Sequence, residues 1–438
     1  MEKSKKNPLS GVLGKIGSTY VGTPLILRIA IGLVIGAVLA LLIPGASFIA
    51  VLGTIFVGAL KAIAPVLVFV LIISALSTAG QGIGPRFAKV VGLYMASTLI
   101  ASMFATGMSF VFKLTIPLVN DSLEGYTPPQ DLGTVFSNLL SKMVENPVSA
   151  LANGNYIGIL TWSIFIGLAM RKIAAPKTKD FLSDLSGAIA KVVGWVIQIA
   201  PFGIIGLVFD SVSTLGMSIF KDYGLLLLLL VGCMLTVSLV INPMIIAITL
   251  KRNPYPLVLR CLKESGIQAL FTRSSAANIP VNMKLCGDLG LDEEYYSVSI
   301  PLGATINMDG AAITISIMSL AAAFSLGIEV NIFIAMLMSI VATLGACGAS
   351  GVPGGSLLLI PMACSLLGVD ATTAMQVVGV GFMIGVIQDS VETALNSSGD
   401  VMFAATAEFS DWRKQGRPIY FTEKEKARAL AEKSEDAE

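Results

Sequence analysis

The chain has 438 residues, of which 55% are hydrophobic and only 13% are charged, and its mean hydropathy is +0.82. A soluble domain carries about 25% charged residues, so this composition excludes an ordinary water-soluble protein and indicates a polytopic membrane protein. The formal net charge of +1 says nothing about partners, since the surroundings of such a protein are mostly lipid, and no nucleic-acid partner is expected. The absence of His excludes imidazole metal sites and His-based catalysis.

Long uncharged stretches predict six membrane-spanning helices in the N-terminal part of the chain, since about 20 apolar residues cross a bilayer as a helix. We expect these spans at 24–43, 49–77, 90–112, 156–170, 190–209 and 224–250. Residues 1–23 lack a short apolar segment followed by a cleavage site, so they are expected to be a cytoplasmic lead-in. Lys and Arg gather before the first span and after the second, fourth and sixth, which predicts that these segments face the cytoplasm.

Beyond residue 253 the apolar runs become short and are interrupted by small and polar residues. Four interruptions are expected, at 269–282 ("ALFTRSSAANIPVN"), 305–312 ("TINMDGAA"), 345–356 ("GACGASGVPGGS") and within 381–407. A Ser/Gly-rich interruption followed by an Asn/Asp-rich one occurs twice, which is a weak internal repeat. Paired interrupted segments are typical of the midplane binding site of a transporter, because unwound backbone is tolerated at that depth only where it lines a cavity.

The last interruption carries Asp389, Glu392, Asn396 and Asp400, which on a helix share a stripe roughly 80° wide. The flanking residues are apolar, and no Lys or Arg occurs from Leu285 to Trp412. A water-exposed cytoplasmic segment is the alternative interpretation. A carboxylate in the membrane core costs about 2.5 to 3.5 kcal/mol on insertion scales, however, so such residues are expected to be retained for a site.

A cation should complete this site. The acids Asp309, Asp389, Glu392 and Asp400 against Arg273 sum to −4 + 1 = −3. Small hard cations held by carboxylates and by the carbonyls of unwound helix would supply the missing charge, and so would the ammonium group of a substrate.

Four motifs carry a resemblance to a known family. "TRSSAANIPV", "PLGATINMDG", "GVPGG" and "DSVETALNSSGD" closely resemble the dicarboxylate/amino acid:cation symporters, which include glutamate transporters, and most closely the bacterial serine/threonine:sodium symporters. The likeness runs from about residue 20 to 410. It implies an all-α polytopic fold with eight transmembrane helices plus two re-entrant helical hairpins, assembled as a homotrimer, in which a transport domain moves like an elevator.

In these terms the chain divides into four parts. Residues 1–23 form a cytoplasmic segment, 24–253 hold six helices that comprise the scaffold and the third and sixth helices of the transport domain, 254–412 form the transport core, and 413–438 a cytoplasmic tail. The core is expected to contain hairpin 1 (255–290), a broken helix 7 (296–325), hairpin 2 (331–367) and helix 8 (371–410). The implied location is the bacterial inner membrane, with lipid around the chain and both termini in the cytoplasm.

The resemblance also implies site residues. The substrate ammonium is assigned to Asp389 and the substrate carboxylate to Asn396 and the hairpin 1 tip. The full expected substrate set is Arg273, Ser274, Ser275, Gly351, Val352, Asp389, Glu392, Thr393 and Asn396. Sodium ions are expected at three sites, formed by Asp400 with carbonyls of Gly303, Asn307 and Asn396; by carbonyls of Thr305, Ala346, Cys347 and Ala349; and by Asp309 and Asn307 with Tyr94, Ser97 and Thr98. Because the family hydroxyls expected at Ala311 and Ala349 are missing, the number of sodium ions stays open.

Glu392 stands where acid-transporting members of the family carry Arg. A substrate carboxylate beside Glu392 would meet like charge, whereas a hydroxyl can donate a hydrogen bond to it. We therefore expect the chain to exclude aspartate and glutamate and to favour serine and threonine. The alternative is that Glu392 pairs with Arg273 and never contacts the substrate.

The sequence thus predicts a sodium-coupled importer of small neutral amino acids and no enzyme. A proton-coupled symporter is the nearest rival, because Glu392 could titrate. An ion channel is less consistent with one chain that supplies paired breaks and a ligand-specific set of residues. An intramembrane enzyme lacks an obvious nucleophile with its base.

Overall fold

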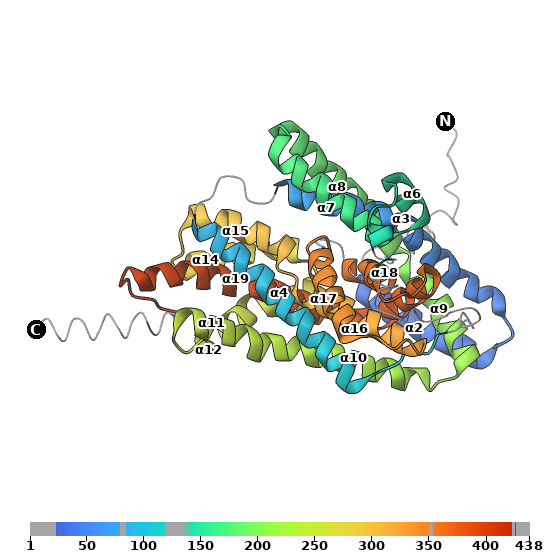
Figure 1. Cartoon of the computed structure of the whole chain (residues 1–438). Coiled ribbons are helices and arrows are strands. Elements are labelled where there is room, and N and C mark those ends of the chain that lie inside the picture. Colours follow the sequence, from blue (N-terminus) through green and yellow to red (C-terminus); the bar gives the residue numbers. More distant parts are fainter. Residues whose placement is uncertain are drawn as a thin grey trace, which may run out of the picture.

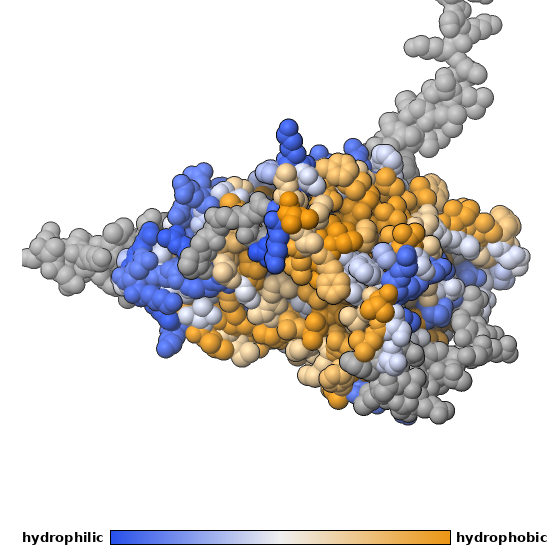
Figure 2. Space-filling view, turned by 45° about the horizontal axis from the view of Figure 1, so that its top comes forward, coloured by the Kyte–Doolittle hydropathy of each residue, from blue (hydrophilic) through white to orange (hydrophobic). Residues whose placement is uncertain are grey.

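The computed structural model describes residues 23–78, 85–118, 137, 140–349, 354–422 and 425. Every regular element in these ranges is a helix (Figure 1). Six helices are long and apolar enough to cross a membrane, and a bent pair raises this to seven. Apolar residues cover the middle of the molecule and hydrophilic residues gather at one end (Figure 2). The prediction of a polytopic, helical membrane protein is confirmed, whereas Gly351, Val352 and the N-terminal lead-in up to residue 22 lie outside the described residues.

Helices α2 to α9 form the N-terminal part. Their bounds are α2 Leu25–Leu42, η1 Ser47–Ile49, α3 Ala50–Thr78, α4 Pro85–Phe112, α6 Pro147–Asn153, α7 Tyr156–Ile173, α8 Pro176–Gln198 and α9 Ala200–Leu215. The span expected at 190–209 is bent, because α8 and α9 meet at Ile199 with a bend of 53°. Pro201 explains the bend, since proline has no N–H for the helix ladder and its ring crowds the preceding turn.

Glycine contacts let α2, α3 and α9 pack backbone to backbone. A Cβ on Gly206 of α9 would lie 2.2 Å from the backbone nitrogen of Gly53 in α3, and one on Gly32 of α2 would lie 2.5 Å from the carbonyl oxygen of Pro201. Membrane helices associate through such close packing of small residues, because lipid provides no hydrophobic driving force between them.

The next segment is a long span followed by a hairpin. The span comprises α10 Ile219–Thr236, a π-helical turn η2 at Val237–Ile241, and α11 Asn242–Leu250. The hairpin comprises α12 Tyr255–Cys261, a second π-helical turn η3 at Leu262–Gly266, α13 Ile267–Thr272 and α14 Ser275–Asp288. Its chain reverses at Arg273, which has a left-handed φ of 52°, and at Ser274, whose side chain caps α14 by accepting from the backbone N–H of Ala277.

The C-terminal part contains the other expected interruptions. Its helices are α15 Glu293–Ile306, α16 Asp309–Ser325, α17 Ile332–Ala346, η4 Gly355–Leu359, α18 Ile360–Leu366 and α19 Ala371–Lys414. The breaks within 269–282, 305–312 and 345–356 are confirmed. The fourth interrupts only the apolar pattern and not the backbone, because α19 is one continuous helix of 44 residues. The polar side chains of α19 form hydrogen bonds with neighbouring elements, so the backbone hydrogen bonds of the helix stay intact.

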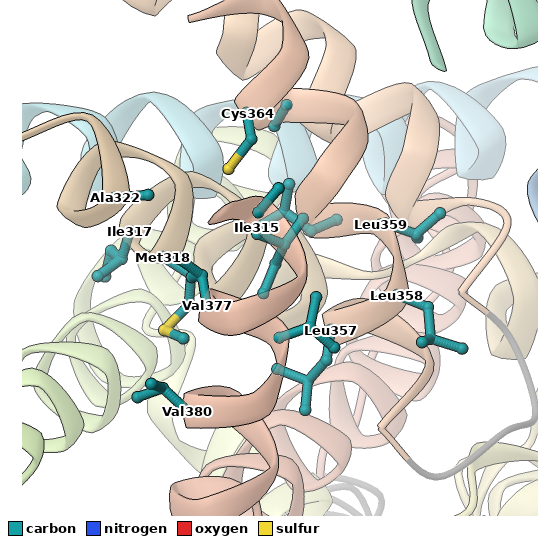
Figure 3. Packing of buried hydrophobic residues seen from close by; sticks show 14 of the residues in the cluster. Ile315, Ile317, Met318, Ala322, Leu357, Leu358, Leu359, Cys364, Val377 and Val380 are labelled. Atoms are coloured by element: carbon teal, nitrogen blue, oxygen red, sulfur yellow. The ribbon is translucent and has the colours of Figure 1, made fainter. Parts of the chain in front are cut away.

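Helix α19 lies inside the molecule. In the apolar window of α19, 67% of residues are buried, compared with 39% in α3, which places far more of its surface on lipid. Buried side chains of α16, η4, α18 and α19 form a continuous apolar cluster around its N-terminal half (Figure 3). The labelled members include Ile315, Met318, Leu357, Cys364, Val377 and Val380. This cluster holds the polar middle of α19 at a fixed place between the helix breaks.

Candidate functional site

Asp389 of α19 receives contacts from the segments beside two breaks. Its side chain is 5% exposed, and its Oδ2 lies 2.6 Å from both Nε and Nη2 of Arg273, at the hairpin tip. Its Oδ1 accepts a hydrogen bond from the backbone N–H of Gly354 at 3.2 Å, just before η4. One carboxylate therefore ties Arg273 to the segment that follows the break after α17.

Glu392 lies one turn further along α19 and is bound by neutral donors. Its Oε2 accepts from Thr314 Oγ1 at 2.8 Å and Ser356 Oγ at 2.9 Å, and also from the amide of Gln388. The alternative that Glu392 pairs with Arg273 is wrong in this structure, because Arg273 pairs with Asp389. The three donors were not predicted from the sequence.

Asn396 and Thr393 share the same face of α19. Asn396 Oδ1 accepts from the backbone N–H of Gly310 at 2.8 Å, and its Nδ2 points to Met308 Sδ at 3.4 Å. A thioether is a weak acceptor, so this amide retains its capacity to donate to a carboxylate. Thr393 Oγ1 donates to the carbonyl of Asp389 at 2.7 Å. Ser274 and Ser275 lie at the N-terminus of α14, where backbone N–H groups and the helix dipole favour an anion.

Asp400 lies against the break between α15 and α16. Nδ2 of Asn307 donates both to Asp400 Oδ1 and to the carbonyl of Asn396, each at 3.1 Å. A Cβ on Gly303 would lie 2.9 Å from Asp400 Oδ1, so this close approach of backbone and carboxylate requires glycine. The structure thus brings together all four residues of the first expected sodium site.

Asp309 lies at the start of α16 and has no exposed surface. Its carboxylate accepts from Ser97 Oγ at 3.0 Å, from Thr98 Oγ1 at 3.1 Å and from Asn242 Nδ2 at 2.9 Å. Tyr94 lies nearby, but its hydroxyl donates to the backbone carbonyls of Asp400 and Ser299.

Asn242 was missed from the sequence, although a signal existed. The signal is a polar amide within the uncharged span 224–250, directly before Pro243. In the structure Asn242 follows the π-helical turn η2. Such turns often occur at functional sites.

The remaining expected sodium site lies where two helices end. Helix α15 ends at Ile306 and α17 ends at Ala346, and Cys347 Sγ lies 3.7 Å from the carbonyl oxygen of Ile306. The last carbonyls of a helix lack intrahelical partners and carry the negative end of the dipole. The carbonyls of Thr305, Ala346, Cys347 and Ala349 therefore lie in a region that favours a cation.

A buried polar cluster that the sequence did not predict joins the hairpin to α19. Asn278 Nδ2 donates to Ser397 Oγ at 2.8 Å and to Ser265 Oγ at 2.9 Å. Asn282 Nδ2 donates to the carbonyl of Ser397 at 3.0 Å and lies 3.5 Å from Asp400 Oδ2. All of these side chains are fully buried. The cluster, defined by Ser265, Asn278, Asn282 and Ser397, fixes both arms of the hairpin beside Asp400.

The donor set suits an alkali cation better than a transition metal. In the parts of the chain that the structure describes, no group of three or more His, Cys, Asp and Glu side chains could hold a metal ion. Asp309 instead accepts from two hydroxyls and the amide of Asn242. Asp400 accepts from the amides of Asn307 and Asn282, beside the carbonyl of Asn396. Carboxylate, hydroxyl and carbonyl oxygens, with one carboxylate in each group, match small hard cations.

Comparison with known proteins agrees with this chemistry. The sequence profile of the sodium:dicarboxylate symporter family matches residues 25–409. A protein of Bifidobacterium adolescentis named serine/threonine transporter SstT is 55% identical over 423 residues, which is 96% of this chain and 98% of that protein. Proteins of the same name from Streptococcus agalactiae and Streptococcus thermophilus are 56% and 54% identical, over 90% and 91% of this chain and 98% of each relative.

Proposed function

Because the chain belongs to the sodium:dicarboxylate symporter family, we propose that it is a sodium-coupled secondary active transporter that imports small neutral amino acids, chiefly serine and threonine. The observation that carries this proposal is the buried stripe of Asp389, Glu392, Asn396 and Asp400 on α19, which faces the segments at three helix breaks. A binding site in a membrane is expected in such a place.

Each residue of the stripe has a role in this proposal. Asp389 binds the substrate ammonium, and Asn396 binds the substrate carboxylate together with Ser274 and Ser275. Thr393, Gly351 and Val352 complete the substrate site. Glu392 selects against acidic side chains and accepts a hydrogen bond from the substrate hydroxyl.

Sodium ions, as co-transported substrates, would be held by the Asp400 group, the Asp309 group and the carbonyls at the ends of α15 and α17. The ions supply positive charge next to carboxylates that are out of contact with water, so substrate binding becomes dependent on sodium. Asn307 contacts two of the three groups through Asp400 Oδ1 and Ser97 Oγ, which supports coupling between them.

The finer architecture is part of the same proposal. We propose eight transmembrane helices with re-entrant hairpins at 255–290 and 331–367, an elevator-type transport domain, and a homotrimer in the bacterial inner membrane with both termini in the cytoplasm. The short helices α14, α17 and α18 support re-entrant hairpins, since none is long enough to cross a bilayer alone.

Replacing external sodium by choline at fixed pH tests the function in proteoliposomes. Labelled serine should accumulate above its external concentration only with an inward sodium gradient. Uptake driven equally well by a proton gradient would favour proton coupling, and equilibration without accumulation would favour a channel. Excess threonine should compete with labelled serine, and excess aspartate should fail to compete; effective competition by aspartate would contradict the substrate class.

A further inference from the structure

Arg273 occupies the place that the proposed function gives to the substrate ammonium. Its guanidinium lies 2.6 Å from Asp389 Oδ2, and the two side chains are only 9% and 5% exposed. We propose that Arg273 is an internal substitute for the substrate ammonium, which neutralises Asp389 in the empty transporter and gives way when substrate binds. This inference rests on the proposed function.

The contacts of Asp389 leave little room for a second cation. Oδ2 is bound by both Nε and Nη2 of Arg273, and Oδ1 accepts from the N–H of Gly354. Nη2 of Arg273 also lies 3.5 Å from the carbonyl oxygen of Gly385, one turn before Asp389 on α19. An incoming ammonium would therefore meet an engaged carboxylate and a positive charge, so the two cations should compete.

The position of Arg273 in the chain permits such an exchange. It lies between α13 and α14 with a left-handed φ of 52°, so neither helix continues through it. Arginine seldom adopts this backbone conformation, and the surrounding contacts must hold it there. When the contact with Asp389 is released, the side chain can leave without unwinding either helix.

The transport cycle explains why the transporter would need the salt bridge between Arg273 and Asp389. After releasing its cargo, a symporter must reorient empty before the next net import. An unpaired carboxylate in a site closed from water is strongly disfavoured, and a salt bridge to Arg273 offsets part of that penalty. In the loaded transporter the substrate ammonium performs the same neutralisation. Arg273 should therefore matter far more for the return of the empty form than for movement of the loaded form.

Purified protein in proteoliposomes separates these two steps. Net uptake is measured as labelled serine entering vesicles without internal serine or sodium, under a sodium gradient. Exchange is measured with equal sodium and unlabelled serine on both sides, where only the loaded form needs to move. In Arg273→Gln, we expect the ratio of net uptake to exchange to fall at least tenfold relative to the parent, and serine binding to tighten severalfold because the competing cation is gone.

Arg260→Gln is the matched control. Arg260 lies in the same hairpin, but it contacts Glu264 and the carbonyl of Phe421 and not Asp389. The ratio of net uptake to exchange in Arg260→Gln should therefore equal the ratio in the parent. Should Arg273→Gln not fold, Arg273→Lys replaces it in the test, because the single ammonium nitrogen of Lys cannot bind Asp389 through two nitrogens as the guanidinium does. The ratio of net uptake to exchange in Arg273→Lys should fall as well, by less than tenfold.

An unchanged ratio in Arg273→Gln or, where that variant is not recovered, in Arg273→Lys would overturn the proposal. So would an equal loss of net uptake and exchange in a variant that still binds serine, since Arg273 would then serve the loaded form. Absence of sodium-driven uptake and exchange in the parent would instead refute the proposed function.

Discussion

Asp400 has no exposed surface, and its carboxylate is bound only by neutral donors among the described residues, at Asn307 and Asn282. Asp400→Asn keeps the size of the side chain and removes the formal charge that a sodium ion would meet. Because charge interactions are strong where water is excluded, we expect the sodium concentration for half-maximal serine uptake to rise at least about tenfold, or about 1.4 kcal/mol.

Asp370→Asn is the matched control for this experiment. Asp370 caps the N-terminus of the same helix by accepting from the N–H groups of Thr372 and Thr373, and Asn caps helices about as well as Asp. Its sodium dependence should equal that of the parent. An unchanged sodium dependence in Asp400→Asn would contradict the assignment of Asp400 to a sodium site.

Glu392→Gln tests how the chain selects its substrate. The variant removes the negative charge and replaces one acceptor oxygen by a donor, so a substrate hydroxyl loses a strong acceptor. We expect the advantage of serine over alanine, measured by competition against labelled serine, to shrink, and aspartate to begin to compete weakly. The donors Thr314, Ser356 and Gln388 should keep the side chain in place. If the ratio of serine to alanine competition stays at the parent value, Glu392 does not accept a hydrogen bond from the substrate hydroxyl.

At this scale the sequence predicted which face of α19 is polar but not which partners that face meets. The stripe from Asp389 to Asp400 follows from helical periodicity alone. Asn242 and Thr314 come from other helices, and the pattern of one helix does not specify the face of its neighbour. Arg273 could have met either Asp389 or Glu392, since both lie on the same face one turn apart, and only the position of the hairpin tip decides between them.

At the scale of elements, the hairpin is held to α19 by the polar cluster of Ser265, Asn278, Asn282 and Ser397. Asn282→Ala would remove the amide that donates to the carbonyl and the hydroxyl of Ser397, at a cost of about 0.5–1.5 kcal/mol for each hydrogen bond. We expect a lower thermal unfolding midpoint in detergent and weaker sodium dependence, because Asn282 also faces Asp400.

A double-mutant cycle separates a shared network from independent losses. Ser397→Ala removes the hydroxyl that Asn278 and Asn282 contact, so its effect on the unfolding midpoint should be less than additive with that of Asn282→Ala. Full additivity would mean that the two residues act separately. Gln268→Ala, at an exposed position of α13 in the same hairpin, is a control that should change the midpoint little.

The elements themselves show what local patterns can predict. Gly, Pro and Ser clusters predicted two of the breaks, and the Asn/Asp-rich stretch at 305–312 predicted a third, because these residues favour turns and left-handed backbone. Asp and Asn on α19 interrupt the apolar pattern but not the helix, since such residues oppose a helix only when their side chains bond to nearby backbone. Here their partners lie on other elements, and the helix continues to Lys414. The π-helical turns η2 and η3 had no recognisable sequence signal.

At the scale of the molecule, the distribution of charge predicts its orientation. Basic residues such as Lys251, Arg252, Lys284 and Arg413 lie at one end, which is strongly hydrophilic in Figure 2, whereas the connection between α2 and α3 at the opposite end carries none. Short loops rich in Lys and Arg stay in the cytoplasm. The end that carries the C-terminus of α19 should therefore face the cytoplasm.

Single cysteines at the two ends test this orientation in intact cells. Gly45→Cys places a thiol between α2 and α3, where a Cβ meets nothing within 4 Å, and Gln415→Cys places one just after α19 at an exposed position. A membrane-impermeant maleimide should label Gly45→Cys in intact cells and Gln415→Cys only after permeabilisation. The parent chain measures the background, which should be small because four of its five cysteines are buried and Cys347 is half-buried. Labelling of Gln415→Cys in intact cells would show that the orientation is the reverse of the one predicted. Sodium entering from outside would then meet the hairpin of α13 and α14 before the hairpin of α17 and α18.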